Sequence, residues 1–322
     1  FLIAGGNVAH TTGSLTSSEV AVGTGTGNSA SYTLSGGSLI MTPGTIPIVG
    51  GGASSFRVGD FGGTGTFAQS GGTITADGSV VIGNRKGTGT FNLSAGTFNV
   101  GQGAGPDKSA LTLGRSKAAD GATLATGTFN ASGGQLHLYA GAPLLVGGDT
   151  FSIADTASSV GIFNQTGTSL VTVDSFLALA SNGTGTYNLN GGTLEIGGTN
   201  GIQQGSGTAN FNMGGGTLKV IGSDLTSAVN ANLTANTYSV INTNGLNATF
   251  SGAITGPLGG LAKTGLGDLA MNNATNTIGS FIIGGGNIAH TTGSLTSSEV
   301  AVGKWVLPRY LDPMNAPVTP PE

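Results

Sequence analysis

Carboxylates are the side chains of this sequence with the clearest potential for catalysis. Asp149, Asp155 and Asp174 form the densest acidic group, and Asp107 and Asp120 form the next. Glycoside hydrolysis needs two carboxyl groups about 5–10 Å apart, and acids on neighbouring structural repeats would meet that distance. Aspartate is also a common turn residue, and Asp149 and Asp155 flank an inserted stretch. We therefore interpret these acids as structural and keep a catalytic role as the alternative.

The histidines and the remaining motifs predict no metal or nucleophile site. His10 and His290 occupy the same position of a repeated sequence, and His137 lies at an outward strand position, so we expect three separate exposed histidines. The stretch from Gly62 to Phe67 departs from a calcium-binding GGxGxD repeat, because Phe67 stands where aspartate is needed. The chain has no cysteine and no nucleophile elbow. We predict no catalytic residue, no metal and no cofactor.

Basic and paired charges are also expected to be structural. Glu195 and Lys219 lie 24 residues apart at the same position of consecutive repeats, and should form an ion pair. Such a pair is worth about 0.2–1 kcal/mol. Lys108, Arg115 and Lys117 form a small basic cluster that we interpret as a solvated loop. With 10 Lys and Arg against 14 Asp and Glu, the net charge of −4 offers no basic patch for nucleic acid or an anionic membrane.

Threonine pairs form the most regular surface motif. Thr-x-Thr recurs at residues 64–66, 88–90, 126–128 and 184–186. Flat threonine ladders occur on ice-binding solenoids, which makes ice binding a further alternative. Ile162 and Asn210 interrupt the ladder, and the high β propensity of threonine explains the motif without a ligand.

The composition limits the scaffold that can hold these side chains. Of 322 residues, 62 are glycine, which costs about 1 kcal/mol in a helix interior, so a helical protein is excluded. The glycines follow no strict triplet and there are only 10 prolines, which excludes collagen. A content of 37% hydrophobic residues argues against disorder. No apolar run approaches the roughly 18 residues that span a bilayer. The composition therefore favours a soluble β protein with a buried core.

Aromatic residues fix the register of an internal repeat. The smallest separation between successive anchors is 24 residues, and it occurs three times. An apolar residue stands seven positions after each anchor, and in six of seven cases another follows two positions later, with mostly polar residues between them. This alternation predicts a strand with one buried face. The seven anchors are Tyr32, Phe67, Phe91, Phe129, Phe163, Tyr187 and Phe211.

Each repeat contains three short strands separated by corners. A glycine pair or near equivalent follows the anchor strand, and a third strand of the type Val-x-Val-Gly precedes most anchors. We therefore predict an all-β fold, a right-handed parallel β-solenoid (β-helix) with three short strands per coil and about 10–11 coils. Residues 1–303 form this single domain, with insertions near 102–110 and 147–158 as loops at its corners. At about 4.8 Å per coil the rod would be on the order of 50 Å long.

One C-terminal segment resembles a known family. Residues 260–271 read GLAKTGLGDLAM, and Asn276, Gly279 and the strand 281–283 follow in family order. This stretch resembles the autotransporter-associated β-strand repeat, also called the passenger-associated transport repeat, although Asp268 and Ile278 depart from its usual residues. The resemblance implies a secreted or cell-surface bacterial stalk used in adhesion, aggregation or matrix building. It also implies a translocation partner in the outer membrane, and no catalytic residue.

The ends of the predicted solenoid carry the same sequence. Residues 1–23 recur as 281–303, with 20 of 23 positions identical at a shift of 280. Two explanations remain open: a segment cut from tandem modules of about 280 residues, or end coils that stack head to tail between copies. After Gly303 the composition changes, because residues 304–322 contain no glycine and five of the ten prolines. We expect this tail to be a linker or a cap that lays Trp305 and Tyr310 over the last coil.

These observations predict a non-enzymatic structural or adhesive β-solenoid stalk of a secreted or cell-surface bacterial protein, located outside the outer membrane. Its expected partners are other copies of the chain through the end coils, or host or matrix glycans and proteins. Nucleic acid is not expected. A polysaccharide-degrading β-helix enzyme is the alternative, and an ice-binding solenoid is the second alternative.

Overall fold

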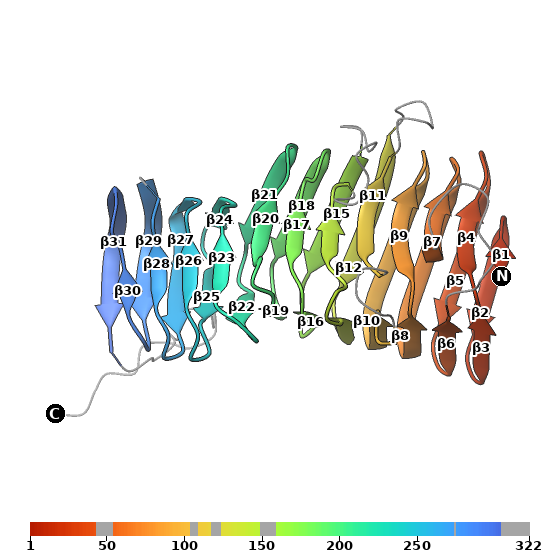
Figure 1. The fold of residues 1–322 in the computed structure, drawn as a ribbon, viewed down its shortest axis with the longest axis horizontal. Coiled ribbons are helices and arrows are strands. Elements are labelled where there is room, and N and C mark those ends of the chain that lie inside the picture. Colours follow the sequence, from red (N-terminus) through yellow and green to blue (C-terminus); the bar gives the residue numbers. More distant parts are fainter. Residues whose placement is uncertain (43–53, 104–108, 117–123, 149–158, 274, 304–322) are drawn as a thin grey trace, which may run out of the picture.

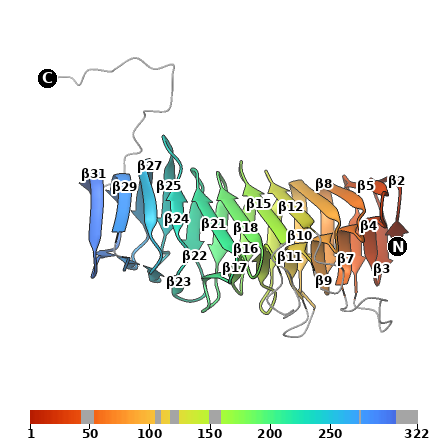
Figure 2. The same cartoon turned by 90° about the horizontal axis from the view of Figure 1, so that it is seen from above.

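The computed structural model describes residues 1–322 except 43–53, 104–108, 117–123, 149–158, 274 and 304–322. Every regular element in the described ranges is a β-strand, and the strands stack in sequence order into a parallel β-solenoid. Figures 1 and 2 show this rod, with the N-terminus at one end and the last coil at the other. The predicted all-β solenoid is confirmed. No helix in these ranges is long and apolar enough to cross a membrane.

Three strand positions repeat in each coil, and we call them the first, second and third face. The first face contains β1 (Leu2–Ile3), β4 (Val20–Thr24), β7 (Ser54–Asp60), β9 (Ser79–Asn84), β11 (Leu111–Arg115), β14 (Leu144–Val146), β17 (Leu177–Leu179), β20 (Ile202–Gln204), β23 (Leu225–Ser227), β26 (Ala248–Phe250), β28 (Leu269–Met271) and β30 (Ile288–Ala289).

The second face follows a corner after the first. It contains β2 (Gly6–His10), β5 (Ser29–Leu34), β12 (Ala125–Ala131), β15 (Ser159–Gln165), β18 (Thr184–Leu189), β21 (Thr208–Met213), β24 (Ala231–Leu233) and the N-terminal parts of five long strands. The third face contains β3 (Ser14–Ser17), β6 (Ser38–Met41), β13 (Gln135–Leu138), β16 (Leu170–Val173), β19 (Thr193–Ile196), β22 (Thr217–Val220), β25 (Tyr238–Asn242) and the C-terminal parts of the same long strands. These long strands are β8 (Thr64–Ala76), β10 (Thr88–Val100), β27 (Ile254–Thr264), β29 (Thr275–Ile283) and β31 (Ser294–Val302).

The aromatic anchors form one continuous column inside the second face. Each anchor is paired with the next in parallel register, as Phe67 is with Phe91 and Phe91 with Phe129. From Tyr32 to Tyr187 the rings stack with centroids 4.7–5.0 Å apart and nearly parallel planes. All seven anchors are buried. The repeat register predicted from the sequence is therefore correct, and ring stacking adds to the hydrophobic burial that holds successive coils together.

The glycine two residues before most anchors is required by a close approach of two faces. A Cβ at Gly89 would overlap two groups of the first face, the carbonyl of Val58 in the preceding coil and the amide of Gly83 in its own coil. Gly83 itself has a φ of +71°, which a glycine adopts without strain. The same crowding occurs at the equivalent glycines Gly65, Gly127, Gly161 and Gly185. The Gly-Thr-aromatic motif therefore reflects a corner with no room for an inward side chain.

The described residues form twelve coils, slightly more than the roughly 10–11 predicted from the sequence. The end coils are short: Leu2 pairs with Ala21, and Leu269 pairs with Ile288. Longer coils insert residues at corners, since Val20 pairs with Phe56. Coil length varies because residues added at a corner leave the pairing of the strands unchanged.

The two copies of the repeated end sequence lie on different faces. In the N-terminal copy, Leu2 and Ala21 pair on the first face. In the C-terminal copy, the equivalent residues Ile282 and Ala301 pair on the third face. In both copies the paired residues are the same distance apart in the sequence. The C-terminal copy is nevertheless shifted by one face relative to the N-terminal copy. The sequence did not reveal this offset, because each of its three apolar stretches fits any face.

Candidate functional site

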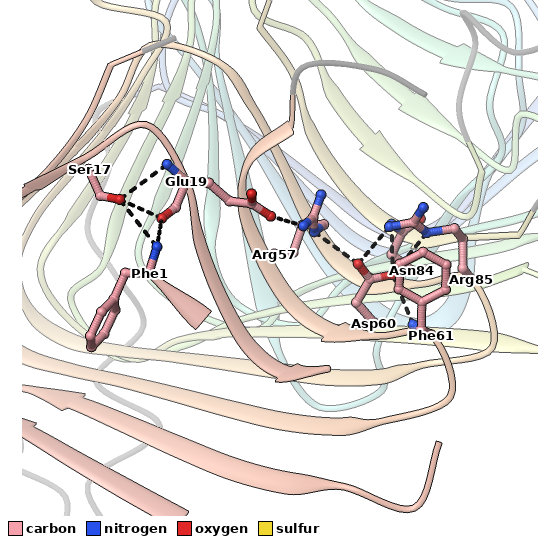
Figure 3. A network of polar contacts seen from close by, with 8 residues as sticks. All are labelled: Phe1, Ser17, Glu19, Arg57, Asp60, Phe61, Asn84 and Arg85. Carbon is pink, nitrogen blue, oxygen red and sulfur yellow. Dashed lines mark hydrogen bonds and ion pairs between the residues drawn. The ribbon is translucent and has the colours of Figure 1, made fainter. Parts of the chain in front are cut away.

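Buried charges join three consecutive coils on the outer side of the first face (Figure 3). Glu19 forms an ion pair with Arg57, and Nε of Arg57 lies 2.9 Å from Oδ2 of Asp60. Arg85 of the next coil donates from Nε and Nη2 to the two oxygens of Asp60 at 3.0 and 2.7 Å. Asn84 donates to Oδ1 of Asp60 at 3.1 Å. Positive and negative groups alternate along this corner network, so its buried charges neutralise one another.

The corner network contains strained backbone. Phe61, Arg85 and Lys86 have φ values of 51°, 46° and 71°, and such conformations cost non-glycine residues of order 1–3 kcal/mol each. The amide of Phe61 donates to Oδ1 of Asp60 at 2.9 Å, and the guanidinium of Arg85 lies 3.5 Å from the centre of the Phe61 ring. These contacts stabilise the strained corner. Because donors occupy both oxygens of Asp60, a structural role fits this acid better than catalysis.

Burial also acts on the charge of Arg57. It lowers the pKa of the guanidinium, Asp60 opposes that shift, and Arg85 adds to it. Sequence reasoning did not single out this network. The available signal was a charge at a position that is apolar in adjacent coils, since Arg57 is paired with Ala21 and with Val81.

The structure places Asp174, one of the predicted acids, beside His137. Oδ2 of Asp174 lies 2.9 Å from Nε2 of His137, and both side chains are about one third exposed. The His137 ring stacks on Tyr139 with centroids 3.9 Å apart. Asp149 and Asp155, with which Asp174 was grouped, and the second pair Asp107 and Asp120 lie outside the described residues. Asp174, the one of these five acids that lies in the described residues, therefore pairs with a histidine.

The predicted ion pair between Glu195 and Lys219 is present on the third face. Nζ of Lys219 lies 2.8 Å from Oε1 of Glu195, and the hydroxyl of Thr172 donates to Oε2 at 2.9 Å. Thr172 also pairs in register with His137. These side chains form a strip of polar groups along four coils, each linked to a neighbouring coil.

An asparagine ladder runs along the second face. Each amide nitrogen donates to the amide oxygen of the preceding coil, at 2.8 Å for four bonds and 3.2 Å for the last. The six residues are Asn92, Asn130, Asn164, Asn188, Asn212 and Asn232. Next to the ladder, the threonines at 64–66, 88–90 and 126–128 are stacked in register. The predicted interruption is also present, because Thr128 is followed by Ile162.

The other predicted positions lie apart. Nδ1 of His10 lies 2.7 Å from the hydroxyl of Tyr32 in the second coil, far along the rod from His137, while His290 belongs to the last coil. Within the described ranges, no group of three His, Asp or Glu side chains has the geometry to hold a metal ion. Of the basic cluster, Arg115 ends β11, while Lys108 and Lys117 are not described.

Lys263, in the segment that resembles the autotransporter repeat, is buried where β27 ends. Its Nζ donates to the carbonyls of Thr264, Gly265 and Gly285 at 3.0, 2.8 and 2.8 Å. The third carbonyl belongs to the following coil. Burial lowers the pKa of this ammonium, and Asp268 opposes the shift. Lys263 therefore joins two coils from within a corner.

Comparison of the chain with protein-family models, with curated proteins and with solved structures finds no match.

Proposed function

We propose that this protein is a non-enzymatic structural or adhesive stalk of a secreted or cell-surface bacterial protein. The asparagine ladder is the observation that carries the proposal. Its amides form hydrogen bonds along the rod axis, each worth about 0.5–1.5 kcal/mol. Because these side chains bond to neighbouring coils, they hold the rod together, and a stalk requires such a rigid rod.

The second face also supports an adhesive role. Its outward row contains one residue per coil and has no ionisable group; the row is Ala9, Thr33, Ala68, the six ladder asparagines, Thr255, Thr277 and Thr296. A neutral surface of hydroxyl and amide groups suits host or matrix glycans and proteins. The resemblance to bacterial surface repeats agrees with a location outside the outer membrane and with export through an outer-membrane partner.

The full chain should bind glycan or matrix-protein arrays without releasing reducing ends from any polysaccharide. The variant Thr90→Lys/Thr128→Lys places two charges on the second face. Compared with the unmodified chain, it should lose array binding while keeping its circular dichroism spectrum. A stalk that binds nothing on such arrays, or whose binding survives both charges, would remove the adhesive part of the proposal.

A polysaccharide-degrading enzyme is the second candidate, favoured by the pairing of His137 with Asp174 in the strip that contains Glu195. The test is polysaccharide hydrolysis by the wild type and by the triple variant Asp149→Asn/Asp155→Asn/Asp174→Asn. Cleavage that disappears in this variant would overturn the structural proposal.

Ice binding is a third candidate, supported by the in-register threonines of β8, β10 and β12. A thermal-hysteresis measurement decides it. Hysteresis that is abolished by Thr90→Tyr would favour this candidate, and a chain without hysteresis would exclude it.

A further inference from the structure

The two copies of the end sequence stack on the rest of the rod through opposite surfaces. Residues 1–23 carry the second coil, because β2 pairs with β5 and β3 pairs with β6. Residues 281–303 use the opposite surface, because β30 pairs with β28 and β31 pairs with β29 of the coil before (Figure 1). Since 20 of 23 positions are identical, both surfaces of this sequence are competent to stack.

The last coil leaves apolar side chains uncovered by any described residue. Val300 and Val302 continue the inward column of Phe281 and Ile283, yet they are 55% and 76% exposed. An inward valine in the middle of the rod, such as Val220, is fully buried. At the other end, the inward side chains of the first coil, including Val8 and Leu15, are only partly buried. Among the described residues, the first and the last coil therefore both expose side chains that point toward the core.

A second copy of the chain would continue the stack with its three faces in the same order. The described strands begin on the first face with β1 and finish on the third face with β31, so they fill complete coils. The coils are complete because the C-terminal copy is shifted by one face. In a continuous stack, β1 of the second copy lies over β30, and its β2 and β3 lie over the two parts of β31. Val8 then lies over the inward column of Leu295, and Leu15 and Ser17, the two inward residues of β3, lie over the two exposed valines.

The sequence also stacks on itself within one chain. Leu2 and Ile3 pair with Ala21 and Val22 in the N-terminal copy, and Ile282 and Ile283 pair with Ala301 and Val302 in the C-terminal copy. The apolar start of the sequence thus fits against its apolar end in two separate places. At the junction between copies, Leu2 and Ile3 would instead lie over Ile288 and Ala289 of β30, which is a different register but again a parallel pairing of apolar stretches.

We propose that the last coil, formed by β30 and β31, is the docking surface for the first coil of a second copy, so that the protein assembles head to tail. The contact joins two different surfaces and is open, so it generates filaments and not closed rings. Unpaired strand edges at both ends supply backbone hydrogen bonds in addition to the apolar contact. The assembly stands apart from the adhesive role, and either can fail while the other holds.

Sedimentation velocity of the full chain over a range of concentrations tests the proposal. The wild type should form species that lengthen with concentration. Val300→Lys/Val302→Lys blocks one end and Val8→Lys/Leu15→Lys blocks the other, so each variant alone should sediment as a monomer. An equimolar mixture of the two should give dimers and nothing larger, because each partner keeps one intact end.

Two controls separate docking from misfolding and from unspecific association. Leu258→Lys and Leu266→Lys replace leucines that are 71% and 83% exposed on the side of the rod, and should leave assembly unchanged. Rescue in the mixture shows that both end variants are folded, and Val302→Lys alone provides a milder block. A wild type that stays monomeric at every concentration, or a variant pair that does not form dimers, would refute the proposal. If removing residues 304–322 is needed before filaments form, the tail and not a second copy occupies the last coil.

Discussion

At the scale of single residues, several ionisable and polar side chains in the described part of the chain are held by specific partners. Asp60 accepts from Phe61, Asn84 and Arg85. Tyr187, whose hydroxyl is buried in the core, donates to Oε1 of Gln165 at 2.6 Å. Buried polar groups of this kind are costly when a partner is lost, so single substitutions should be informative.

Asp60→Asn should destabilise the fold by about 3–5 kcal/mol, because it leaves Arg57 and Arg85 buried without their shared counter-ion. Urea denaturation followed by circular dichroism measures the loss. Asp224→Asn is the matched control: its carboxylate is exposed, and hydrogen bonds from Asn247 lower its pKa, so its removal should cost far less. Equal losses in the two variants would show that the corner network contributes no special stability.

Tyr187→Phe should change how stability depends on pH. Burial raises the pKa of Tyr187 well above 10.0 in the folded protein, whereas in the unfolded chain it ionises near that value. The neutral phenol therefore stabilises the fold below pH 10, and this contribution is lost as the pH rises above 10. Relative to wild type, the variant should be about 1–3 kcal/mol less stable at pH 7, because Gln165 loses a partner. The difference should narrow at pH 11 in urea titrations, and a constant difference would contradict the linkage.

At the scale of elements, cohesion between strands depends on matched positions in successive coils. The second face holds rings inside and amides outside, and both columns use the same parallel register. The repeat spacing predicted this face and its strands, because period-2 alternation and the aromatic anchors are local signals. The corner network was not predicted, since Glu19, Asp60 and Arg85 come from three coils and only their folding together creates the site.

Asn164→Ala should destabilise the rod by about 1–2 kcal/mol, because two ladder bonds of ordinary strength are lost, one to Asn130 and one from Asn188. Equilibrium unfolding in urea checks this value. Asn232 forms the last amide–amide bond of the ladder, so Asn232→Ala should cost less. Equal effects at the two positions would show that the second ladder bond of Asn164 adds no stability.

Gly89→Ala should destabilise by about 1–3 kcal/mol or more, because its methyl group would overlap backbone atoms of Val58 and Gly83. Gly5→Ala is the control, since a methyl group there meets only an ordinary contact with the carbonyl of Ser29 at 3.7 Å. Thermal denaturation of both variants measures the difference. A tolerated Gly89→Ala would show that the first and second faces can separate at this corner.

At the scale of the whole molecule, each coil touches chiefly the coils before and after it, so stability should be distributed locally. In Gly89→Ala, amides of β9, β10 and β12 should lose protection from hydrogen exchange, while those of β26 to β29 should keep it. Hydrogen-exchange mass spectrometry measures both groups. A uniform loss along the rod would instead indicate a single cooperative unit.

Some features of the whole molecule could be predicted from the sequence and others could not. The coil architecture followed from one repeated motif, whereas the coil number was underestimated because the first coil and the last four coils lack an aromatic anchor. The one-face shift between residues 1–23 and 281–303 depends on how many corners and insertions intervene, which local patterns do not encode.

The unequal length of the coils has a consequence for how such a chain can change. Val20 meets Phe56 and Phe56 meets Val80 in the same column, although 36 residues separate the first pair and 24 the second. A coiled coil loses its heptad frame when a few residues are inserted, whereas here an insertion at a corner leaves the frame of every strand intact. The corners are therefore sites where a lineage, or a protein engineer, can graft new sequence without redesigning the core.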